Sequence, residues 1–137
     1  MIPELKIIIF EEKNILKKML GQLDEQYDLV IAKEVMKIDK IAKELDETAK
    51  ELARMEIKRR KVMGSDASVK EAVALCEDEN VKKAYEDIVK MLNMIEIQKE
   101  ANSMLIKQRL FFTKKMINCI KPNPGVGTYN AYGQVGK

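Results

Sequence analysis

Apolar residues at heptad spacing are the feature that most constrains how this chain can fold. Between residues 4 and 31 the same position returns every seven residues, at Ile9, Leu16, Leu23 and Val30. This spacing places an apolar seam along one side of an α-helix, and such a helix is stabilised by neighbours that cover the seam. Pro3 suits the first turn, because the N–H that proline lacks has no helical partner there. The pattern predicts a long helix packed against others.

A second helix is predicted from about residue 35 to residue 63. Its seam alternates spacings of three and four, at Ile38, Ile41, Leu45, Thr48, Leu52, Met55, Arg59 and Val62. Gly64 follows as a C-cap, and the basic run Lys58–Lys61 falls in the last turns, where positive charge complements the helix dipole. A nucleic-acid patch is the alternative reading of that run, but one short basic stretch at a helix end is typical of a solvated terminus.

A short helix and a third long helix are predicted next. Ser68 and Glu71 form a capping-box pattern, which starts a short helix that ends near Cys76. The acidic residues 77–79 lack the spacing of a calcium loop and suit the N-terminus of a helix from about residue 80 to Ile120. The predicted seam of that helix includes Val81, Tyr85, Ile88, Leu92, Ile95 and Asn102. Asn102 is the polar residue in this seam. A buried asparagine at such a position commonly fixes the alignment of neighbouring helices, and we assign Asn102 this role.

The third long helix exceeds the first two in length. At 1.5 Å per residue it measures roughly 60 Å, against roughly 42 Å for each of the others. If it runs antiparallel along the second helix, its last dozen or so residues, "LFFTKKMINCI", extend past the bundle and expose Leu110, Phe111 and Phe112. Exposed patches of this kind usually mark binding sites. The alternative is that the helix bends, or that the first helix covers these residues and makes them core.

Residues 121–137, "KPNPGVGTYNAYGQVGK", contain two prolines and four glycines. This composition predicts a flexible tail, and Tyr129 and Tyr132 give it two aromatic anchors for a partner. We therefore expect an all-α fold: an antiparallel helical bundle or coiled coil of three long helices, with a short connecting helix, in residues 1–120, followed by the disordered tail.

Composition excludes several classes of function. The chain has no histidine, the commonest general base and metal ligand, and no glycine-rich phosphate loop, so we expect no enzyme, cofactor or metal site. Cys76 and Cys119 form no metal or redox motif and are expected to be buried or half-buried. The net charge of +3 is mild, with basic and acidic residues alternating along the helices, which argues against nucleic acid. No segment is apolar enough for membrane insertion, so a cytoplasmic protein is expected.

Several segments, in this order, resemble the FlgN family of flagellar export chaperones. They are the heptad helix that ends in "LARMEIKRRKVMG", the N-x-x-L pattern from Asn102 to Leu105, the segment "NSMLIKQRLFF", and the Y-N-x-x-G pattern from Tyr129 to Gly133. The resemblance covers nearly the whole chain. The glycine-rich tail with a second tyrosine departs from the family pattern, and leaves open which ring docks.

The resemblance implies a cytoplasmic chaperone that binds the terminal helical segment of hook-associated proteins, prevents premature assembly and delivers them to the type III export gate. It implies that the following residues contact the client: Leu105, Leu110, Phe111, Phe112, Met116 and Ile120. It implies that Tyr129, with Tyr132 and Gly133, docks at the cytoplasmic domain of the gate. The free protein is expected to be a monomer or a weak homo-oligomer.

A structural or adaptor coiled-coil protein that self-associates is the alternative. It would share the heptads and could share the tail. The two readings differ in their complexes, since a chaperone forms a small, roughly equimolar complex with one client, whereas a structural coiled coil assembles with itself.

Overall fold

The structure is a computed structural model and describes residues 1–64 and 68–120, except for the side chain of Ile120. These residues form helices and no strand. The long helices are α1 (Pro3–Ala32), α2 (Val35–Met63) and α4 (Glu79–Ile120), and the short α3 (Val69–Ala74) precedes α4. The predicted all-α fold of three long helices and one short connecting helix is confirmed.

The chain divides between Asn102 and Ser103 into two units, and α4 contributes to both. The first unit, Met1–Asn102, contains α1, α2, α3 and the beginning of α4. The second unit, Ser103–Lys137, is described as far as residue 120. The predicted tail lies outside the described residues, so its disorder and the proposed boundary at residue 120 stay predictions.

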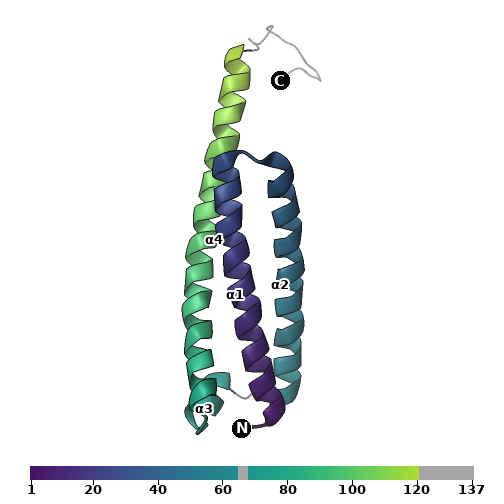
Figure 1. Ribbon diagram of the computed structural model, residues 1–137, viewed down its shortest axis with the longest axis vertical. Helices are drawn as coiled ribbons and strands as arrows, with labels where there is room; N and C mark the ends of the chain where they lie inside the picture. Colours follow the sequence, from purple (N-terminus) through teal and green to yellow (C-terminus); the bar gives the residue numbers. More distant parts are fainter. Residues whose placement is uncertain (65–67, 121–137) are drawn as a thin grey trace. The chain divides into compact units, whose positions relative to one another are not determined.

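In the first unit, α1 lies between α2 and α4 (Figure 1). α1 and α4 run in the same direction and α2 runs in the opposite one, so α2 is antiparallel to both. Lys33 and Glu34 join α1 to α2. Lys33 adopts a left-handed conformation with φ 60°, and its N–H donates to the carbonyl oxygen of Val30 at 3.2 Å. This tight turn is what makes the first two helices antiparallel neighbours.

Two buried apolar clusters stabilise the first unit. One joins α1 to the α3 region and the start of α4 through Leu5, Ile9, Val73, Cys76, Val81 and Ala84. The other joins α1 to α4 through Leu16, Leu23 and Ile95, with Leu45 and Leu52 of α2 among the residues packed against it. All four predicted heptad residues of α1 are buried. The heptad pattern therefore identified the face of α1 that packs against both other long helices.

Local hydrogen bonds cap the ends of the helices. Gly64 caps α2 with φ 84°, and its N–H donates to the carbonyl oxygen of Arg60 at 2.9 Å. The hydroxyl of Ser68 accepts from the N–H of Glu71 at 3.3 Å, which is one half of the predicted capping box. Asp78 accepts from the N–H of Asn80 at 3.0 Å at the start of α4. These caps satisfy backbone groups that a helix leaves without partners at its ends.

Two packing predictions are wrong. Leu92 was expected in the seam of the third long helix but is 46% exposed, and it lines a pocket together with residues of α1 and α2. Cys119 was expected to be at least half-buried but is exposed, whereas Cys76 is buried as predicted. Both buried clusters are built from residues of the first unit, and Cys119 belongs to the second.

Candidate functional site

The second unit carries a group of large apolar side chains that solvent reaches. Between residues 103 and 119, seven of these side chains are 38% to 67% exposed. We call this set the α4 apolar surface: Met104, Ile106, Leu110, Phe111, Phe112, Met116 and Ile117. A group of exposed apolar side chains as large as this usually marks a site where another molecule binds.

Most of the predicted client-contacting residues belong to this surface. Leu110, Phe111, Phe112 and Met116 are 55%, 67%, 58% and 47% exposed, whereas Leu105 is half-buried. The side chain of Ile120 lies outside what the structure describes, as do the predicted docking residues Tyr129, Tyr132 and Gly133. Met104, Ile106 and Ile117 are exposed members that the sequence prediction did not assign to the site. Their signal was their position within a few residues of the Leu-Phe-Phe run.

The apolar side chains point in more than one direction around the helix. Successive residues of an α-helix turn by about 100°, so Leu110, Phe111 and Phe112 together span roughly 200° of its circumference. One neighbouring helix covers a narrower stripe than this. The α4 apolar surface therefore offers contact area to a partner on more than one side.

The charged residues of this part of the chain are all basic. Residues 103–120 contain Lys107, Arg109, Lys114 and Lys115 and no acidic residue. All 22 acidic residues lie in Met1–Asn102 with 19 of the 25 basic ones, so the first unit has net charge −3 and the second +6. The expectation that basic and acidic residues alternate along the helices is wrong for the C-terminal part of α4. The Lys115 ammonium lies 5.8 Å from the centroid of the Phe111 ring.

Asn102 is 2% exposed, and its side chain connects α4 to α1. Its amide nitrogen donates to the carbonyl oxygen of Leu23 at 2.8 Å and to Oε1 of Gln26 at 2.9 Å. Its Oδ1 accepts from Nε2 of Gln98 at 2.9 Å. A buried polar side chain with all of these partners is stable at one alignment of the two helices, since a shift would leave its hydrogen bonds unmade.

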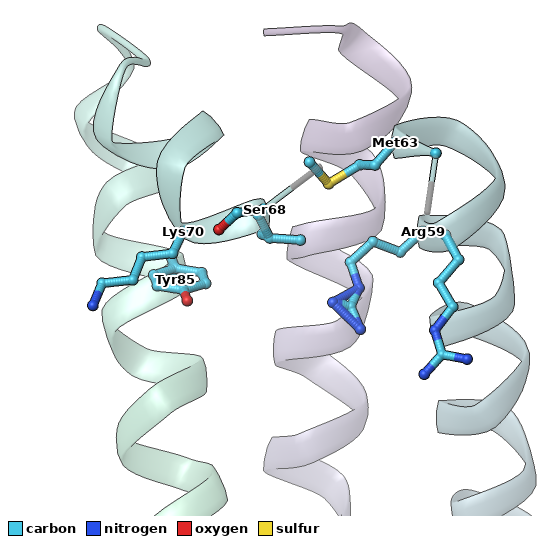
Figure 2. A pocket seen from close by; sticks show the side chains of 8 residues that line it. Arg59, Met63, Ser68, Lys70 and Tyr85 are labelled. Atoms are coloured by element: carbon cyan, nitrogen blue, oxygen red, sulfur yellow. The ribbon is translucent and has the colours of Figure 1, made fainter. Parts of the chain in front are cut away.

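A pocket of about 670 Å³ lies in the first unit. It is lined by Arg59, Arg60, Met63, Gly64, Ser68, Val69, Lys70 and Tyr85. Figure 2 shows Arg59 and Met63 extending from α2 on one side, and Ser68, Lys70 and Tyr85 on the other. Arg60 pairs with Glu56 at 2.9 Å, and the Ser68 hydroxyl caps α3. Two of the polar groups in this pocket therefore have structural partners.

Arg59 also pairs within the first unit. Its Nε lies 3.6 Å from Oε1 of Glu12 on α1, and the two side chains are 25% and 12% exposed. Burial raises the pKa of the Glu12 carboxyl, the charge of Arg59 lowers it in part, and Glu56 adds to the rise. The pair links α1 to α2, and this explains why a charged residue, Arg59, occupies a seam position.

Several acidic side chains of the described part pair with lysines or arginines. In residues 1–64 and 68–120, no three His, Cys, Asp or Glu side chains come together as a metal site requires. Asp78, from the acidic stretch at the start of α4, instead contacts the Lys6 ammonium at 3.3 Å. Among the helices of the described part, none is both long and apolar enough to cross a membrane. The α4 apolar surface is therefore the strongest candidate for a functional site.

Comparison with protein families agrees with this geometry. A family model described as FlgN protein matches residues 1–137, the whole chain. The chain belongs to the FlgN family. FlgN is a family of flagellar export chaperones and not of enzymes, so a role as a chaperone in flagellar export is supported. Comparisons with curated proteins and with solved structures gave no match.

A chaperone has to bind other polypeptides, and exposed leucine, phenylalanine and methionine side chains are suited to that task. The resemblance on which the sequence prediction rested is confirmed.

Proposed function

We propose that this FlgN-family protein is a cytoplasmic chaperone for hook-associated proteins. It binds the terminal helical segment of its client on the α4 apolar surface, prevents premature assembly and delivers the client to the type III export gate. The observation that carries the proposal is the exposure of the adjacent residues Leu110, Phe111 and Phe112, each more than half exposed.

The physical basis of binding is burial of apolar area. Transfer of a leucine or phenylalanine side chain from water to a packed interface contributes roughly 1.5–3 kcal/mol, of which part is offset by the cost of association. An amphipathic client helix presents anchors at spacings of three and four, which suits contact with a helical surface. Met104 and Met116 add unbranched side chains that adapt to partners of different shape.

Docking at the gate is assigned to the tail. Tyr129 and Tyr132, with Gly133, are the candidates, because tyrosine supplies a large contact area at low cost in side-chain entropy. Removal of the residues after Pro124 is expected to leave helicity and client binding unchanged and to abolish binding to the cytoplasmic domain of the gate. Loss of client binding in the truncated protein would contradict this division of roles.

The experiment that tests the proposal is sedimentation of the full chain alone and with the terminal fragment of a hook-associated protein. We expect a monomer or weak homo-oligomer alone, and a small, roughly equimolar complex with the fragment. Self-association into elongated species that do not bind the fragment would instead identify a structural or adaptor coiled coil.

A further inference from the structure

We propose that the segment bound by the α4 apolar surface is acidic and contacts α4 on more than one side. The inference rests on the proposed function and specifies the chemistry of the partner. It follows from two observations together. Apolar side chains spread around the helix, and all charged residues of the second unit are basic.

The cations of this part of α4 have no acidic neighbour in their own unit. Lys107, Arg109, Lys114 and Lys115 stand among the apolar residues, and Ser103–Lys137 contains no aspartate or glutamate. Lys115 lies over the ring of Phe111, so a partner that buries the ring also brings its own groups close to this ammonium. Burial of a cation without a counter-charge is costly. A partner with carboxylates beside its apolar anchors removes that cost and avoids like-charge repulsion.

The arrangement also favours a protein partner over an anionic membrane surface. A helix that lies in a membrane interface keeps its apolar residues on one face and its cations on the other. Here the apolar residues and the cations alternate around the helix, because Arg109 directly precedes the Leu-Phe-Phe run and Lys114 and Lys115 lie two and three residues after it. Leu110, Phe111 and Phe112 cannot enter one flat surface together. A polypeptide that contacts the helix from more than one side can bury all three.

The test measures binding to the full chain at low and high salt. The probes are the terminal fragment of a hook-associated protein and a synthetic amphipathic helical peptide with leucines at spacings of three and four, flanked by glutamates. A matched peptide carries glutamines in place of the glutamates. We expect the glutamate peptide to bind roughly tenfold to hundredfold more tightly than the glutamine peptide at low salt, and the difference to shrink at high salt.

Two variants of the protein isolate the charges. In the first, Lys107, Arg109, Lys114 and Lys115 are all replaced by Gln. The matched control replaces four exposed lysines of the first unit by Gln, giving the same change in net charge: Lys17, Lys37, Lys40 and Lys90. We expect the first variant to lose the preference for the glutamate peptide and the control to keep it. Circular dichroism and thermal melting check that both variants fold.

The outcomes distinguish the inference from the function on which it rests. A fragment that does not bind the unaltered protein contradicts the proposed function. If the fragment binds but the protein binds the two peptides with equal affinity, the inference alone is overturned and the proposed function stands. Salt-sensitive binding to vesicles of anionic phospholipid without peptide binding overturns it in favour of a membrane surface. Salt-sensitive self-association without peptide binding overturns it in favour of a second copy of the chain.

Discussion

The side-chain nitrogen of Asn102 on α4 donates a hydrogen bond of 2.8 Å to the carbonyl oxygen of Leu23 on α1. The same nitrogen donates to Gln26, and the oxygen of Asn102 accepts from Gln98. The network lies at the end of the first unit, near the start of the exposed part of α4. We interpret it as the contact that fixes the register of α4 against α1.

Replacement of Asn102 by Asp tests this role. At neutral pH the introduced carboxylate carries no donor and would lie against the oxygen atoms of Leu23 and Gln26. We expect a loss of roughly 3 kcal/mol or more in the free energy of unfolding, since a buried charge would be left unpaired. Asn93→Asp, at an exposed position of α4, is the control and is expected to change stability by less than about 0.5 kcal/mol. Urea unfolding gives both values, and equal effects at the two sites would argue against a register contact.

Gly21 offers a stabilising substitution. It lies inside α1, and a Cβ built there meets no atom within 4 Å. Gly21→Ala is therefore expected to raise the free energy of unfolding by roughly 1 kcal/mol through helix propensity.

Gly64 is the contrasting case for the same substitution. Its φ of 84° and ψ of 164° are strained for any residue with a Cβ, although the space around it is open. We expect Gly64→Ala to lower stability by about 1–3 kcal/mol. Thermal melts of the two variants should move in opposite directions, and a shift of both in one direction would be inconsistent with this backbone argument.

Asp87 links α4 to α1 in a pH-dependent way. Its carboxylate lies 3.2 Å from the Lys83 ammonium and 3.3 Å from that of Lys13. Contact with Lys83 lowers the pKa of Asp87 below its ordinary value of 3.8, burial opposes this, and Lys13 lowers it further. A lowered pKa in the folded state means that the stabilising contribution is present above pH 3.8 and is lost as the pH falls through the folded-state pKa.

We therefore expect Asp87→Asn to be less stable than the unaltered chain at neutral pH. The difference should vanish as the solution is acidified through that range. Melting temperatures measured across an acid series give the comparison, with Asp24→Asn, at an exposed carboxylate of α1, as the control. A difference that persists unchanged in acid would show that Asp87 contributes through its shape and not through its charge.

The bounds of the long helices could be predicted from the sequence because local signals and periodicity agree. Gly64 ends α2 at the predicted place, and the seven-residue spacing of Leu16 and Leu23 predicts the buried face of α1. Such signals depend on a few neighbouring residues. They do not depend on which helix lies opposite.

The exposure of Leu92 could not be predicted in the same way. A seam position reports that a residue faces the inside of a bundle, but not how completely neighbouring helices enclose it. Leu92 is at a seam position of α4 but is 46% exposed, and it lines a pocket with residues of α1 and α2. Cys119 was misplaced for a related reason, because a preference for burial assumes that packing partners exist.

Part of the candidate site was visible in the sequence. The run Leu110–Phe112 cannot face one seam, and all three side chains are exposed as expected. The positive charge of the second unit does not show in the net charge of the whole chain, because the −3 of the first unit offsets half of the +6 of the second.

We propose that the α4 apolar surface binds the client. The most direct test is the affinity of the terminal fragment of a hook-associated protein for a variant with Leu110→Gln, Phe111→Gln and Phe112→Gln, measured by calorimetry. The matched control replaces three exposed apolar residues of the first unit by Gln: Met36, Met94 and Ile97. Both variants should melt close to the unaltered protein, since each altered side chain is at least half exposed.

We expect the Leu110–Phe112 variant to lose affinity by roughly hundredfold or more, because the anchors that supply most of the buried apolar area are gone. The control should bind as the unaltered protein does. Equal affinity of all three proteins for the fragment would contradict binding of the client at the α4 apolar surface.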